Sequence, residues 1–116
     1  MSTSFPDVSI PAFNKYITMI EPTTDAIVSA PIEVRSGQIH TLVCTNITGG
    51  AEEYIKLEIY DTTTETWQDF YKYGEVLKMT AGSTIAVLRD LSALIRFNKT
   101  ETASPVGLSI NRNAGG

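Results

Sequence analysis

Hydrophobic and polar residues alternate along several short stretches of this chain. The clearest stretch spans residues 53–60, where Ile55, Leu57 and Ile59 alternate with charged residues and tyrosines. Successive side chains of a β-strand point to opposite faces, so this alternation predicts a strand with one face in a core and the other in water or against a partner. A second alternating stretch, residues 93–98, predicts a strand of the same kind.

Segments rich in Val, Ile, Thr and Tyr, about eight in all, run from Ile27 to Ile110, separated by turn residues roughly every 8–12 positions. No helical stripe interrupts them for more than two turns. Parallel sheets need long crossover connections, for which the chain has no room. The spacing therefore predicts an all-β fold, an antiparallel β-sandwich of jelly-roll or Ig-like type. Pro31 predicts an edge strand or a bulge at its position, because proline cannot donate to a sheet ladder.

Residues 1–24 have a different pattern. Pro6, Pro11 and Pro22 each fix a backbone angle and remove a hydrogen-bond donor, yet large apolar residues lie between them. We interpret this segment as an extended arm that lies on the chain's own sheet or on a neighbouring subunit. Residues 25–110 are then the sandwich domain and residues 111–116 a flexible tail. The arm residues predicted to form a subunit or capsid interface are Phe5, Val8, Ile10, Phe13, Tyr16 and Ile17.

Composition excludes several classes of protein. The 116 residues carry a net charge of -4, which argues against a nucleic-acid binder, since such proteins need clustered Lys and Arg. No apolar run approaches the roughly 18–20 residues that cross a bilayer, so no membrane partner is expected. One cysteine excludes an internal disulfide framework and a multi-cysteine zinc site.

His40 and Cys44 are the only residues of their types, four positions apart on one predicted strand face. A metal site needs three or four ligands, and no nearby carboxylate completes a set. A strand offset of about 13 Å makes His40 a poor base for a cysteine nucleophile. We therefore expect Cys44 to be a small buried apolar residue and His40 to lie at the rim. No metal or cofactor is predicted.

Acidic residues offer one other candidate for chemistry. Asp61, Glu65 and Asp69 surround one predicted turn, and Glu52 and Glu53 are adjacent. Glycoside hydrolysis needs two carboxylates across a cleft, and nothing in the sequence places these acids in that way. A solvated charged turn is the favoured interpretation, and no enzyme activity is predicted.

Aromatic residues cluster between positions 60 and 73. Flat rings stack on sugars, so Trp67, Tyr71 and Tyr73 define an alternative function, a carbohydrate-binding or adhesin-type module. The favoured interpretation places Trp67 and Phe70 in the core and the tyrosines at edges or interfaces, where a ring with a polar tip is useful.

From about Ile20 to Ile110 the chain resembles small β-sandwich proteins of tailed-phage virions, such as head decoration (cement) proteins. The runs that carry this resemblance are residues 29–34 (SAPIEV), 53–59 (EYIKLEI), 94–99 (LIRFNK) and 106–110 (VGLSI). The resemblance implies a non-enzymatic subunit that assembles on a capsid or tail. We therefore expect a homo-oligomer, trimer or dimer, that binds a larger virion protein such as the major capsid protein, in a virion assembled in the host cytoplasm.

Overall fold

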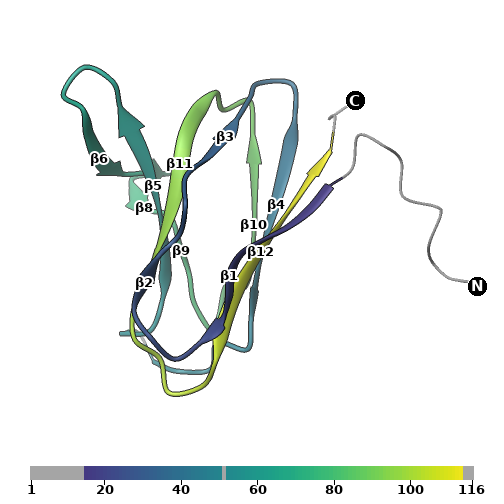
Figure 1. Cartoon of the computed structure of the whole chain (residues 1–116), viewed down its shortest axis with the longest axis vertical. Coiled ribbons are helices and arrows are strands. Elements are labelled where there is room, and N and C mark those ends of the chain that lie inside the picture. Colours follow the sequence, from purple (N-terminus) through teal and green to yellow (C-terminus); the bar gives the residue numbers. More distant parts are fainter. Residues whose placement is uncertain (1–14, 51, 114–116) are drawn as a thin grey trace, which may run out of the picture.

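The structure, a computed structural model, describes residues 15–50 and 52–113, and this part of the chain is all β, with antiparallel strands and no helix (Figure 1). No helix that is long and apolar enough to cross a membrane is present in these residues. The all-β prediction is confirmed. Twelve strands are assigned in the described part, against about eight expected from the sequence, and the additional ones are elements of two or three residues.

The first large sheet has four strands and contains both ends of the described chain. Its strands, in spatial order, are β1 (Lys15–Thr23), β12 (Val106–Asn113), β4 (Ile39–Thr45) and β10 (Ile85–Arg89). In the register of this sheet, Ile110 lies opposite Ile17 on one side and Leu42 on the other. Strands β1 and β10 are therefore its two edges.

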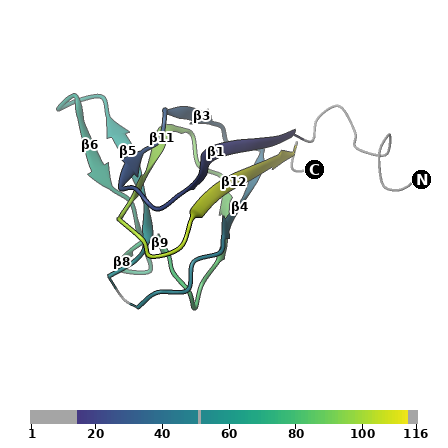
Figure 2. The ribbon, with the colours of Figure 1, turned by 60° about the horizontal axis from the view of Figure 1, so that its bottom comes forward.

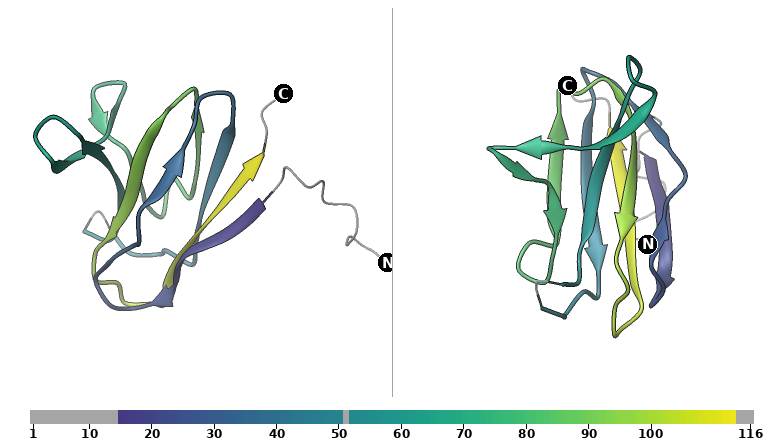
Figure 3. Two further views of the ribbon diagram at one scale, coloured as in Figure 1. Left: turned by 45° about the horizontal axis from the view of Figure 1, so that its top comes forward. Right: turned by 90° about the vertical axis from the view of Figure 1, so that its left-hand side faces the viewer.

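The second large sheet has six strands. Its main path is β2 (Ile27–Val28), β11 (Ala93–Lys99), β5 (Ile55–Asp61) and β6 (Thr66–Asp69), while β3 (Ile32–Val34) also pairs with β11 and β9 (Lys78–Met79) with β5. Pro31 lies between β2 and β3, where this sheet edge is interrupted, as its missing donor predicts. A small hairpin, β7 (Tyr71–Lys72) with β8 (Glu75–Val76), connects β6 to β9, and Figure 3 shows the β5–β10 region from two sides.

The core lies between the two large sheets, which form separate layers in Figure 2. Leu42 and Ile110 from the four-stranded sheet, and Ile55, Leu57 and Phe97 from the six-stranded sheet, are all fully buried in one cluster. Burial of each such side chain stabilises the fold by about 1.5–3 kcal/mol. Two antiparallel layers around a shared core are consistent with a β-sandwich.

The paired sheet extends beyond the predicted domain limits of 25 and 110 at both ends. Residues 15–23 of the predicted arm form β1, which pairs with β12, and Ile20 is part of the core. Strand β12 in turn continues to Asn113. Gly107 permits the close approach of the two strands, because a Cβ there would lie 2.9 Å from the carbonyl oxygen of Ile20. Pro22 is tolerated because β1 is an edge and its register is already shifted between Ile20 and Thr23.

Lys99, the last residue of β11, has an unexpected buried position. It is 1% exposed and shares the buried face of β11 with Phe97. Its Nζ donates to Asp25 O at 2.7 Å, to Thr100 O at 3.0 Å and to Thr102 Oγ1 at 3.1 Å. Burial lowers the pKa of the Lys99 ammonium, while these acceptors replace the water it loses and hold two loops together.

Candidate interaction surfaces

The outer face of the six-stranded sheet is built from ion pairs. Strand pairing places one residue of β11, two of β5 and one of β6 side by side on it, because directly opposite residues share a face. Glu58 Oε1 accepts from Arg96 Nε at 2.6 Å, and Lys56 Nζ lies 2.8 Å from Asp69 Oδ1 and 3.6 Å from Glu58 Oε2. We define the charged face as Lys56, Glu58, Asp69 and Arg96 with the adjoining rings of Tyr60 and Trp67.

The charged groups of the charged face form ion pairs with one another. The hydrogen bond to Asp69 raises the pKa of the Lys56 ammonium, which keeps this group charged. The Arg96 guanidinium carbon lies 4.4 Å from the centre of the Trp67 ring, and the Tyr60 ring meets Trp67 edge-on at 5.2 Å. Glu58 is nearly buried, at 7% exposure, by the partners that pair with it. A face of this kind resists desolvation, because its charges are paired with each other and half in water.

The outer face of the four-stranded sheet has the opposite character. From the Val43–Ser109 pair to the Thr41–Asn111 pair, the side chains that β4, β10 and β12 direct away from the core contain no ionisable group; they are Thr41, Val43, Ile85, Val87, Ser109 and Asn111, and exposed Arg89 follows at the end of β10. We call these six residues the uncharged face. Strand β1 extends it with Tyr16 and Thr18, which lie opposite Asn111 and Ser109.

Several apolar side chains of this surface are open to solvent. Tyr16 is 65% exposed, Ile85 59% and Val43 36%. Among the described residues nothing donates to Asn111 Oδ1, although this oxygen is buried. Aliphatic side chains gain when water is removed, and neutral hydroxyl groups lose less than ionised groups do, so the uncharged face is easier to bury against a partner than the charged face.

The structure describes two of the six predicted interface residues. Phe5, Val8, Ile10 and Phe13 lie outside the described residues. Tyr16 is on the outer side of β1, beside the uncharged face, while Ile17 points the other way and packs against the core. Tyr16 is thus available for a contact, whereas Ile17 serves the fold.

The three residues of the glycan alternative have different surroundings. Trp67 is half-buried under Arg96, and its described contacts are with Arg96 and Tyr60. Tyr71 and Tyr73 belong to the β7–β8 hairpin and are 62% and 95% exposed. Their exposure suits a sugar platform, but the guanidinium already occupies one face of the Trp67 ring. Phe70 packs against the core, as predicted, whereas the expected core position of Trp67 is wrong, because it faces outward opposite Tyr60.

His40 and Cys44 both face the core of the four-stranded sheet. Cys44 is buried, as predicted, and burial raises the pKa of its thiol. The expected rim position of His40 is wrong: it is 1% exposed, and its Nε2 accepts from Arg112 Nε at 3.1 Å. Burial, followed by the Arg112 charge, lowers the pKa of the imidazole. The sequence pattern does not reveal the partner that allows this burial, because Arg112 is 72 positions away.

The acids of the β5–β6 turn have structural partners. Asp61 Oδ1 accepts from Thr63 N at 2.9 Å and from Thr64 N, which lowers the pKa of this carboxyl. Asp69 pairs with Lys56, and Glu65 adopts a positive φ of 57° in the turn. Within residues 15–50 and 52–113, no three His, Cys, Asp or Glu side chains gather as metal ligands would.

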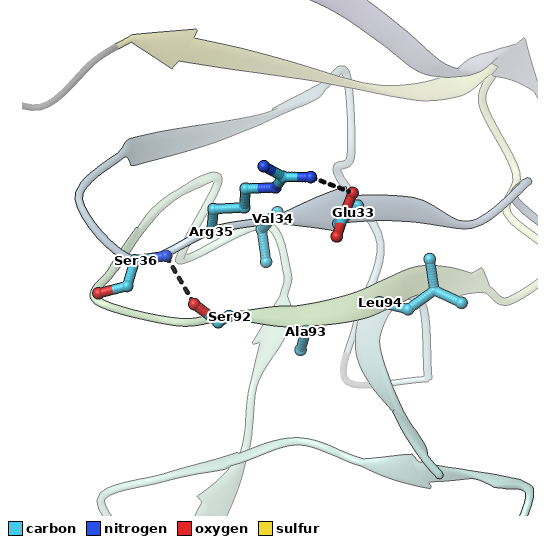
Figure 4. Close-up of a pocket in the computed structure, with 7 residues that line it drawn as sticks. All are labelled: Glu33, Val34, Arg35, Ser36, Ser92, Ala93 and Leu94. Atoms are coloured by element: carbon cyan, nitrogen blue, oxygen red, sulfur yellow. Dashed lines mark hydrogen bonds and ion pairs between the residues drawn. The ribbon is translucent and has the colours of Figure 1, made fainter.

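A hollow of about 740 Å³ lies where the end of β3 meets the start of β11 (Figure 4). Its only ionised lining residues, Glu33 and Arg35, pair with each other at 3.1 Å and are well exposed to solvent. Ser92 Oγ accepts from the backbone N of Ser36 at 2.8 Å. In Figure 4 the Glu33–Arg35 pair and the Ser36–Ser92 hydrogen bond lie at the junction of β3 and β11. These groups provide neither a nucleophile with an adjacent base nor a pair of carboxylates.

No known protein family, curated protein or solved structure matches this chain.

Proposed function

We propose that this chain is a non-enzymatic structural subunit of a tailed-phage virion that binds a capsid or tail surface as a homo-oligomer, trimer or dimer. Its two layers would form a sandwich of the jelly-roll or Ig-like type. The uncharged face, together with the N-terminal arm that leads into β1, would be the surface that joins neighbouring copies. The resemblance in sequence to decoration proteins supplies the virion setting, and a larger virion protein such as the major capsid protein would be the partner.

One observation carries the proposal: the two outer faces differ in charge, and the uncharged one exposes large apolar side chains. Ile85 and Val43 on the uncharged face, with Tyr16 beside them, present apolar area that is worth roughly 25 cal/mol per Å² when a partner covers it. Exposed contiguous apolar surface on a small protein typically marks an interaction site. The hollow between β3 and β11 offers no comparable support for catalysis.

The test is substitution on one face with a matched substitution on the other. Val43→Lys on the uncharged face should lower the molar mass measured by light scattering, because a buried unpaired ammonium costs several kcal/mol, and should weaken association by at least about tenfold. Leu94→Lys on the outer face of the six-stranded sheet is the matched control, since Leu94 is 38% exposed and Val43 36%. We expect Leu94→Lys to keep the molar mass of the unmodified chain.

Two results would contradict the proposal. One is a molar mass that stays at 12.7 kDa, that of a single chain, over the full concentration range of the unmodified protein. The other is an oligomer that Leu94→Lys disrupts and Val43→Lys leaves intact.

A further inference from the structure

Strand β10 has a free backbone edge. Cys44 N donates to Thr84 O at 2.8 Å, and antiparallel pairing alternates, so Ala86 and Leu88 also direct their backbone groups toward β4. The N–H and C=O groups of Ile85, Val87 and Arg89 therefore point away from the sheet. Among the described residues, β10 pairs with β4 and with no other strand. Such an edge is a template for one more strand.

A groove of about 570 Å³ follows this free edge. On the side opposite β10 it is lined by Lys72 and Tyr73 of the hairpin and by Val76 and Leu77, which lead toward β9. On the β10 side it is lined by Ile85, Ala86 and Val87. The edge and the groove thus lie together, so an added strand would find backbone partners and apolar side-chain contacts in the same place.

The edge is only lightly covered in the free chain. Lys72 Nζ donates to Val87 O at 3.3 Å, and Lys72 is itself exposed. This bond shows that the Val87 carbonyl is accessible from the groove. A lysine that covers an edge carbonyl is a common protection against unwanted pairing, and it exchanges readily with water or with an incoming backbone N–H.

We propose that this groove receives residues 1–14 of a second copy of the chain, which add a strand to the free edge of β10. The inference rests on the proposed function, because it names the contact through which the copies join. One such segment would dock in each groove, and the backbone of residues 7–10, between Pro6 and Pro11, would pair with β10.

The length and origin of the arm support this occupant. Fourteen residues precede Lys15, which begins β1 at the edge of the four-stranded sheet opposite β10. Pairing of residues 7–10 with β10 takes about 14 Å of extended chain, which leaves residues 11–14, or up to about 14 Å, to span the distance from the groove of one copy to Lys15 of the other. Each copy therefore offers an arm at one edge and a groove at the other, which is a head-to-tail contact that closes into a ring when the geometry allows.

The composition of the arm also fits the groove. Its large apolar residues Phe5, Val8, Ile10 and Phe13 match a groove lined by Val76, Leu77 and Ile85. Asp7 is the only charged side chain in residues 1–14. Two lysines, Lys72 and Lys78, against one acid, Glu75, line the groove, so the charges are complementary.

The test is disulfide capture between two full-length chains that each carry one added cysteine. A chain with Ile10→Cys is mixed with a chain with Tyr73→Cys, whose position is 95% exposed and lines the groove. Oxidation should give a heterodimer band on a non-reducing gel. Leu94→Cys in place of Tyr73→Cys is the control and should give none. Buried Cys44 remains in every chain, so the unmodified protein measures the background.

A second substitution tests the backbone pairing itself. Val87→Pro in the Tyr73→Cys chain removes an outward N–H, a change that edge strands tolerate, and should abolish the heterodimer band. Val87→Ala keeps the N–H and should retain the band. Circular dichroism confirms that both variants are folded.

The outcomes separate this inference from the proposed function. Oligomers that Val43→Lys disrupts, but that give no heterodimer band, overturn the arm in the groove and leave the proposed function standing. A disulfide within one chain carrying both Ile10→Cys and Tyr73→Cys, at monomer mass, overturns the second copy as occupant. A chain that is monomeric at every concentration overturns both.

Discussion

The two large sheets share an alternating pattern, yet their outer faces differ in what fills the polar positions. On the charged face, β5, β6 and β11 carry ion pairs around Glu58. On the uncharged face, β4, β10 and β12 carry Thr, Ser, Asn, Val and Ile. Paired charges cost more to remove from water than neutral hydroxyl and amide groups do, and aliphatic side chains gain by it. Period-2 alternation thus determines which residues face outward, while the chemistry of those residues determines whether the face stays in water or accepts a partner.

The largest predicted effect breaks the charged face. Arg96→Ala leaves Glu58, which is 7% exposed, without its 2.6 Å partner. Lys56 remains near Glu58 and Arg96 is partly exposed, so we expect a loss of about 2 kcal/mol in the free energy of unfolding, below the range for a fully buried pair. Urea unfolding measures this loss, and light scattering should show an unchanged molar mass.

Arg89→Ala is the matched control, because Arg89 is an exposed arginine for which the described residues provide no ion pair. It should change stability by less than about 0.5 kcal/mol. Equal losses for the two variants would mean that the ion pairs contribute no stability. A fall in molar mass for Arg96→Ala would place the charged face in the subunit contact.

A smaller effect, a dependence of stability on pH, comes from buried His40 and its partner Arg112 and not from either outer face. His40 is buried and accepts from Arg112, whose Nη2 donates to Glu33 O at 2.7 Å across to β3. The pKa of His40 is lowered from 6.5, so below pH 6.5 the unfolded chain binds a proton that the folded chain does not. Stability should therefore fall as pH decreases through 6.5, by at most about 1.4 kcal/mol per pH unit, until the pKa of the folded state is reached.

Urea unfolding between pH 7.5 and 5.5 measures this slope, and His40→Gln, which cannot titrate, isolates it. The free energy of unfolding of the unmodified chain minus that of His40→Gln should therefore fall as the pH decreases. A difference that stays constant with pH would show that His40 has the same pKa in both states.

The sequence pattern predicted an all-β fold and which residues of the alternating strands face the core, but it left strand order open. The strands expected over residues 53–60 and 93–98 are present, the first beginning at Ile55, because their alternation needs no knowledge of partners. Lys99 was missed because the predicted strand stopped at Asn98; one residue more places Lys99 on the face of Phe97. Its three acceptors come from loops that the strand pattern does not describe.

The candidate surfaces were less predictable. Thr, Val and Ile form good strands on either side of a sheet, so their presence does not reveal which outer face lacks charge until pairing brings β4, β10 and β12 together. The groove beside β10 joins residues 72–78 to residues 85–87 through tertiary structure. Edge strands are likewise defined by strand order, which periodicity leaves open.

The central claim, that copies join at the β10 side while the charged face stays in water, has one direct measurement. It is amide hydrogen exchange of the full-length chain at high and at low concentration, compared between the free edges β10 and β6. We predict that association slows exchange at Ile85, Val87 and Arg89, whose N–H groups point away from β4, and leaves residues 66–69 unchanged. Slower exchange at β6 with no change at β10 would contradict the account.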